Sequence, residues 1–88
     1  MLTIESKDNP KLKHLRGLIE QSSLRKKSQQ SVLEGAHLIE SYLAQNHQPV
    51  SIFTTADGFD HIENQQAIEL STCPVFLIPE QIYKSLSP

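Results

Sequence analysis

A run of four apolar residues, 75–78, lies between Pro74 and Pro79 and limits what this chain can fold into more than any other feature. A strand that is apolar at every position is typical of a strand with both faces buried, as in parallel sheets with helices on each side. Pro74 breaks the segment before the run, and Pro79 suits the first position of a helix after it. We therefore expect a buried strand at 75–78, followed directly by a helix at 80–86.

Strand and helix patterns alternate along the rest of the chain. Asn9 and Pro10 predict a helix N-cap and a first helical residue, and an apolar stripe runs from Leu12 to Ile19. The predicted elements are a helix at 11–21, a loop or frayed helix end at 22–30, a strand at 31–34, a helix at 36–45, a strand at 50–55 and a helix at 59–70, before the strand at 75–78 and the helix at 80–86. This alternation predicts the α/β class, with a small, mostly parallel sheet covered by helices.

The length of 88 residues allows one small domain. A domain of this size buries a modest fraction of its surface, which argues against a deep catalytic cavity. No apolar run reaches the length of a membrane span, and the first residues lack the pattern of a signal peptide. The single Cys73 cannot form an intrachain disulfide and fits a reducing compartment. We therefore expect a cytoplasmic protein with no membrane partner.

The net charge of −2 is unevenly distributed along the chain. Residues 1–27 carry seven basic and three acidic side chains, a net +4, whereas residues 28–88 carry one basic and seven acidic side chains, a net −6. Because salt screens charges over about 10 Å at 0.1 M, a local basic region can attract a polyanion whatever the total charge. The alternative is a solvated basic helix, in which Arg16 and Glu20 support each other as an i,i+4 pair.

Residue types that would carry catalysis or bind a metal are scattered. Gly17, Gly35 and Gly58 share no phosphate-binding loop motif, and no serine lies in a nucleophile-elbow pattern. The four histidines and Cys73 show no metal-ligand spacing. The sequence therefore predicts no catalytic residue and no metal site, which favours a binding or structural module over an enzyme.

Two segments together carry a family resemblance. Residues 4–15 read I-E-S-K-D-N-P-K-L-K-H-L, and Arg25 is followed at 32–39 by V-L-E-G-A-H-L-I. In this order and spacing they resemble the N-terminal substrate-binding domain of SpoU/TrmH-type RNA 2′-O-ribose methyltransferases of the SPOUT superfamily. The resemblance implies a three-layer α/β/α sandwich similar to the kink-turn-binding ribosomal proteins, with residues 1–88 as one RNA substrate-binding domain.

In the family that the chain resembles, a separate C-terminal trefoil-knot domain binds S-adenosylmethionine, supplies the catalytic arginine and dimerises. None of its motifs occurs in residues 1–88. The resemblance therefore implies that this chain binds no cofactor and does not methylate RNA alone. It also implies a homodimer that forms through the other domain.

The basic residues and the resemblance together give a candidate RNA-binding set. Lys11 and Lys13 follow the Asn9 of the motif, and Arg25 matches an arginine of the family. Lysines suit phosphate contacts that read no sequence, and an arginine can hold a phosphate through two hydrogen bonds. The role of Asn9 is explained fully by a helix N-cap as well. The complete set is Asn9, Lys11, Lys13, Arg16, Arg25, Lys26, Lys27 and His37.

The predicted function is an RNA-binding accessory domain that positions RNA, ribosomal RNA in the first instance, for ribose 2′-O-methylation. Ser31 stands where the family commonly has a larger apolar residue, and the acidic second half of the chain leaves only one face suited to RNA. The alternative is a protein-interaction or scaffold domain that contacts its catalytic partner or ribosomal proteins. In that case Leu18 and Tyr42 are the candidate exposed anchors.

Overall fold

A computed structural model describes residues 1–86. Its strands form one parallel sheet in the order β1-β3-β2, so that the apolar run supplies the central strand. The strands are β1 (Leu2–Thr3), β2 (Ile52–Thr54) and β3 (Val75–Leu77). Phe76 of β3 lies opposite Phe53 of β2, and the two rings stack with 5.3 Å between their centroids. The predicted small parallel sheet is confirmed.

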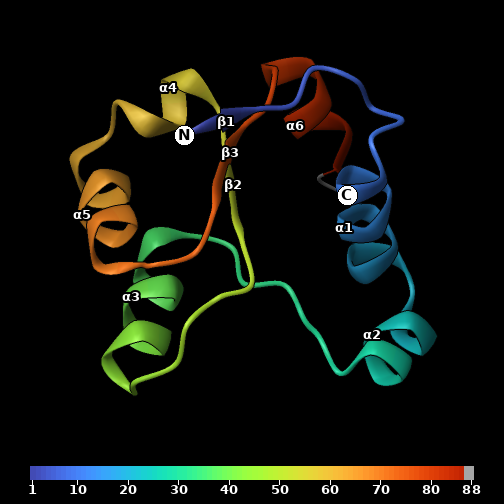
Figure 1. Ribbon diagram of the computed structural model, residues 1–88, viewed down its shortest axis with the longest axis horizontal. Helices are drawn as coiled ribbons and strands as arrows, with labels where there is room; N and C mark the ends of the chain where they lie inside the picture. The colour runs from blue at the N-terminus through green and yellow to red at the C-terminus, as the bar shows by residue number, and fades with distance from the viewer. Residues whose placement is uncertain (87–88) are drawn as a thin grey trace.

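Helices cover both faces of the sheet (Figure 1). One side carries α1 and α2, which pack against each other, together with α6, whereas the other side carries α3, α4 and α5. The helices are α1 (Pro10–Glu20), α2 (Ser22–Ser28), α3 (Ala36–Ala44), α4 (Ala56–Phe59), α5 (Ile62–Leu70) and α6 (Glu80–Leu86). The predicted α/β class and three-layer α/β/α arrangement are confirmed. None of the helices in residues 1–86 combines the length and the hydropathy that a membrane-spanning helix requires.

The main core lies between the sheet and the side that carries α1 and α6. Leu12, from the predicted apolar stripe, is completely buried. It clusters with four other buried residues, Ile4, Phe76, Ile78 and Leu86. Burial of such side chains is the dominant favourable term in folding. The opposite side is thinner, because α3 contributes no buried residue and α5 contributes only Ala67.

Three helices begin and end within about a residue of the positions that their sequence signals predict. Asn9 caps α1, since its Oδ1 accepts a hydrogen bond from the Lys11 N–H at 2.9 Å, and Pro10 occupies the first turn. The helices predicted at 36–45 and 80–86 correspond to α3 and α6. Local sequence signals are therefore sufficient to place these three helices, and for α1 the signal is a side-chain cap.

Two helical segments differ from the prediction. Residues 22–28 form α2 where a loop or frayed helix end is predicted, because the Arg25 side chain donates to backbone carbonyls at the end of α1. The helix predicted at 59–70 begins three residues later, at Ile62, as α5, and a separate short helix, α4, precedes it at Ala56–Phe59. Thr55 caps α4, because its Oγ1 accepts a hydrogen bond from the Gly58 N–H at 2.9 Å.

The strand predicted at 31–34 does not form. The segment connects α2 to α3 without regular structure, and none of its backbone groups bonds to another backbone group within residues 1–86 (Figure 1). A strand forms only when its backbone pairs with that of another strand. The apolar residues of this segment indicate a propensity for extended structure, but they do not supply such a partner. Conversely, Leu2 and Thr3 form β1, a strand too short for its sequence to reveal, because β3 offers them a parallel edge.

Candidate nucleic-acid interface

Arg25 holds α2 against the end of α1. Its Nη1 donates hydrogen bonds to the carbonyls of Leu18 at 2.7 Å and Ile19 at 3.3 Å, and the side chain is half-buried. The last carbonyls of a helix lack a partner within the helix, and a positive group there also interacts favourably with the helix dipole. Arg25 therefore positions the two lysines that follow it. Its expected contact with phosphate stays a prediction.

Three other candidates at α1 also have structural roles. Arg16 Nη2 donates to Ser85 Oγ of α6 at 3.2 Å. The Lys11 Nζ lies 5.4 Å from the centroid of the Phe76 ring, within the range of a cation–π interaction. The side-chain oxygen of Asn9 is used by the helix cap. These three side chains stabilise the fold whether or not they also contact RNA.

Lys13, Lys26 and Lys27 face solvent. Within residues 1–86 their ammonium groups enter no hydrogen bond and no ion pair with the protein. An ammonium without an internal partner can bind a phosphate without first breaking another contact. These three lysines are therefore the part of the predicted set best suited to a polyanion.

The sequence did not single out Lys84, which lies in the last turn of α6 and is exposed. In the linear charge distribution it belongs to the acidic part of the chain. The fold brings α6 beside α1, where Ser85 accepts the hydrogen bond from Arg16. Lys84 thus joins the basic helices through tertiary structure alone, and no local pattern in the sequence signals it.

His37 lies apart from the other candidates. It is exposed in the first turn of α3, immediately after the helix begins at Ala36. This helix covers the face of the sheet opposite to α1 and α2 (Figure 1). The structure therefore does not bring His37 together with the basic residues of the predicted set.

The two sides of the sheet differ in charge. The helices α1, α2 and α6 together carry seven basic and two acidic residues, a net +5, and are called the basic layer below. The helices α3, α4 and α5 carry four acidic residues and no lysine or arginine, a net −4, and are called the acidic layer. The charge asymmetry along the sequence thus becomes an asymmetry across the sheet.

A groove of about 1180 Å³ separates the two layers. It is lined by Leu15 and Ile19 of α1, by Ile39 and Tyr42 of α3, and by Phe53 of β2. Lys11 and Arg25 also line it, but most of its surface is apolar, and apolar surface does not stabilise a phosphate. Phosphates are therefore better accommodated on the outer surface of the basic layer than inside the groove.

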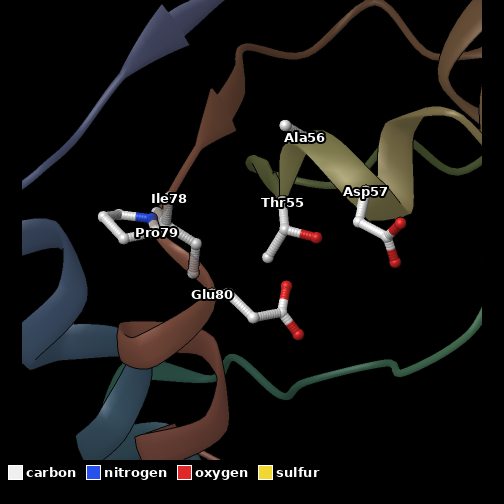
Figure 2. Close-up of a pocket in the computed structure, with 6 residues that line it drawn as sticks. All are labelled: Thr55, Ala56, Asp57, Ile78, Pro79 and Glu80. Carbon is white, nitrogen blue, oxygen red and sulfur yellow. The ribbon is translucent and has the colours of Figure 1, made fainter.

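A smaller pocket of about 370 Å³ lies at the carboxyl ends of β2 and β3 (Figure 2). Ligands often bind at this position in open α/β sheets. Here, however, Asp57 and Glu80 both line the pocket, and two carboxylates repel an anion. Among residues 1–86 no three His, Cys, Asp or Glu side chains gather in a way that could hold a metal ion. The pocket is therefore unsuited to phosphate.

A three-layer α/β domain with one strongly basic layer has the charge distribution that is typical of polyanion-binding modules. The sequence profile of the MRM3-like substrate binding domain matches residues 9–88. The chain belongs to this family, the N-terminal domain of SpoU-type rRNA 2′-O-methyltransferases, which confirms the resemblance carried by residues 4–15 and 32–39. No curated protein and no solved structure matches the chain significantly. Membership of the family implies a role in the recognition of an RNA substrate.

Proposed function

We propose that this domain docks on structured RNA, ribosomal RNA in the first instance, and so positions a nucleotide for ribose 2′-O-methylation. The observation that carries the proposal is the division of charge between the layers, with seven basic residues in one layer and no lysine or arginine in the other. Neutralisation of phosphates by such residues, with release of counterions, supplies most of the non-specific affinity for nucleic acid. The basic layer is therefore the docking surface.

Within the basic layer, lysines and arginines have different tasks. Lys13, Lys26 and Lys27 bind phosphates, because an ammonium group is a compact charge that can turn toward any phosphate oxygen. Arg16 and Arg25 hold together the helices that carry these lysines. Contacts to phosphate fix the position of the RNA without reading its bases. Docking therefore depends on the shape and charge of the RNA more than on its sequence.

The methyl transfer itself is proposed to belong to a separate trefoil-knot domain that binds S-adenosylmethionine and forms the homodimer. This chain then needs no cofactor of its own. A ligand raises the melting temperature only of a protein whose native state binds it. Added S-adenosylmethionine should therefore leave the melting temperature of this chain unchanged. A rise that grows with its concentration would place a cofactor site in this domain and contradict the division of tasks.

Titration with a structured ribosomal RNA fragment at several salt concentrations tests the docking. Each neutralised phosphate contributes about 0.7–0.9 to the slope of log affinity against log salt. The double variant Lys26→Ala/Lys27→Ala should lower that slope by about 1.5 and weaken binding equally for RNAs of different sequence. Binding that is insensitive to salt, or a loss confined to one RNA sequence, would contradict docking through phosphates.

A matched control separates the basic layer from the total charge. The double variant Ser41→Glu/Gln66→Glu lowers the net charge by the same two units, but at exposed positions of α3 and α5 in the acidic layer. Beyond a Debye length of about 10 Å these charges are largely screened from phosphates on the other side of the sheet. Binding should therefore weaken much less than in Lys26→Ala/Lys27→Ala. Equal losses would show that net charge, and not the basic layer, governs the affinity.

A second candidate function is protein interaction through the acidic layer. The predicted anchor Leu18 is wrong for this purpose, since only 6% of it is exposed, whereas Tyr42 is 36% exposed. Apolar side chains of α3 and α5 support this candidate, because Leu38, Ile62 and Leu70 are each more than half exposed. An absence of RNA binding even at low salt would favour this function over docking on RNA.

A further inference from the structure

The outer side of the acidic layer presents large apolar side chains to solvent. Ile62 and Leu70 of α5 are 63% and 61% exposed, and Leu38 of α3 is 54% exposed. Ile62 and Leu70 are slightly more than two helical turns apart, so they lie on the same half of the helix surface. Glu63 and Glu69, their neighbours in sequence, are exposed as well. The exposed side of α5 therefore combines apolar side chains with negative charge.

The carboxylates on this side have no positive partner within the molecule. The helices α3, α4 and α5 hold no lysine or arginine. The one ion pair within residues 1–86 joins His61 to Asp57 at 4.0 Å, so Glu63 and Glu69 enter none. Apolar side chains next to unpaired carboxylates fit a partner that is positively charged and also has aliphatic or aromatic surface. RNA lacks that chemistry, because carboxylates repel its phosphates.

The basic layer of the same chain has the chemistry that this partner needs. Lys13, Lys26 and Lys27 are exposed and enter no ion pair within residues 1–86. The aliphatic stem of a lysine can cover apolar surface while its ammonium group reaches a nearby carboxylate. Tyr83 of α6, which is 41% exposed, adds aromatic surface. The net charges of the two layers, +5 and −4, are of opposite sign and similar size.

The two layers lie on opposite sides of the sheet and therefore cannot meet within one molecule (Figure 1). We propose that the acidic layer, through the exposed side of α5, docks the basic layer of a second copy of this chain. A second copy is a better occupant than an unrelated basic protein, because the same molecule carries both complementary surfaces. Contacts between two different surfaces extend from copy to copy and do not close as a symmetric dimer.

The contact is electrostatic and weak, because exposed charge pairs each contribute little. Charges act over about 30 Å at 10 mM salt but over only about 8 Å at 150 mM salt. The copies should therefore associate at low salt and separate as the salt concentration rises. The contact itself does not depend on the proposed RNA docking. If that docking holds, RNA and a second copy compete for Lys26 and Lys27.

Sedimentation velocity of the unmodified chain, without RNA, tests the contact. Samples should span about 10 to 500 µM, the range in which weak contacts become populated. The average sedimentation coefficient should rise with protein concentration at about 10 mM salt and approach that of the monomer at about 150 mM salt. A monomer at every concentration in low salt would overturn the proposal.

Two double variants distinguish docking of the layers from an effect of total charge. Lys26→Ala/Lys27→Ala changes the net charge from −2 to −4, whereas Glu63→Gln/Glu69→Gln changes it to 0. Each removes two charges from one of the two surfaces, so each should raise the dissociation constant about 2- to 30-fold. Non-specific association is instead promoted by a net charge near zero. Stronger association of Glu63→Gln/Glu69→Gln would therefore overturn the proposal.

A mixture of the two variants gives the sharpest test. The lysine variant keeps the acidic layer intact, and the glutamate variant keeps the basic layer intact. An equimolar mixture should therefore form a 1:1 complex that does not grow further, although each variant alone associates weakly. Absence of this complex would contradict a contact between different layers. Circular dichroism of each variant checks that it is folded, which is expected because all four side chains are exposed.

Ile62→Ser tests the apolar part of the contact without a change in charge. The variant should weaken association at low salt and leave its dependence on salt unchanged, because no charged group is removed. Association equal to that of the unmodified chain would overturn the assignment to this side of α5. Since these experiments contain no RNA, their outcomes are independent of the salt titration that tests RNA docking.

Discussion

The basic and acidic layers are attached to the same sheet by different means. The basic layer supplies Leu12, the one completely buried large side chain within residues 1–86, and the side chains of Arg16 and Arg25 connect its helices. The acidic layer buries only Ala67 from its helices. The His61 and Asp57 side chains there approach to 4.0 Å, but both are exposed, and exposed pairs contribute little. The larger stabilising contacts therefore lie on the side that carries the positive charge.

This difference suits a surface that binds phosphate. Seven basic side chains in one layer repel one another, and a weakly anchored set would separate to reduce that repulsion. The apolar core and the arginine hydrogen bonds hold the helices in place, so that the lysines stay on one side of the sheet. The acidic layer has no such requirement. Its exposed apolar residues, Leu38, Ile62 and Leu70, suit the contact with a protein partner that is the second candidate function.

The largest expected difference between the two layers is the loss of unfolding free energy when a leucine is replaced by alanine. Leu12→Ala should lower the free energy of unfolding by about 2–5 kcal/mol, because it leaves a cavity in the main cluster. Leu38→Ala in the acidic layer should change it by about 0.5 kcal/mol or less, since Leu38 is 54% exposed. Urea denaturation measures both. If Leu12→Ala leaves no folded protein, Leu12→Val gives a smaller loss to compare, and equal losses in the two layers would contradict the assignment of the core.

The next largest difference is between Arg25, which is expected to affect stability, and Lys26, which is expected to affect RNA binding. Arg25→Ala should lower the free energy of unfolding by about 1–2 kcal/mol, because α2 loses its hydrogen bonds to the carbonyls of α1. It should also reduce the helical signal in circular dichroism. Lys26→Ala, with an exposed side chain, should stay within about 0.5 kcal/mol of the unmodified chain while it weakens RNA binding. If Arg25→Ala lowers RNA affinity without any loss of stability, Arg25 acts on RNA and not on the fold.

A smaller loss is expected at the start of α1. Asn9→Ala removes the oxygen that accepts from the Lys11 N–H and should cost about 1 kcal/mol. Asn9→Asp should retain most of the stability, since aspartate also caps helices and favours the positive end of the dipole. Thermal or urea unfolding of the two variants distinguishes the roles. Equal stability of Asn9→Ala and the unmodified chain would leave RNA contact as the explanation for Asn9.

Elements with local signals could be predicted from the sequence, and elements that depend on a distant partner could not. Asn9 and Pro10 mark the start of α1, and the apolar run gives β3, because capping and strand burial act within a few residues. The formation of α2 depends on bonds from Arg25 to the carbonyls of a different helix. The segment 31–34 has the composition of a strand, but composition does not determine whether another strand lies close enough to pair with it.

The candidate site, like the fold, could be predicted from the sequence only where it depends on neighbouring segments of the chain. The basic first part of the chain correctly indicated that Lys13, Lys26 and Lys27 share one side of the molecule, because α1 and α2 are consecutive and pack together. It could not indicate that the fold adds Lys84 to that side and places His37 on the other, since both depend on how the helices cross the sheet. Nor could it separate the arginines that hold helices from the lysines that face solvent.

The smallest expected effect concerns Lys84, which is the residue that only the fold assigns to the basic layer. Lys84→Ala should leave the stability within about 0.5 kcal/mol, because the side chain is exposed, and should lower the slope of log affinity against log salt by less than one. Lys84→Arg keeps the charge and should restore the slope. If Lys84→Ala does not change the slope while Lys26→Ala/Lys27→Ala lowers it, RNA contacts α1 and α2 but not α6. The docking surface would then end at the bond between Arg16 and Ser85.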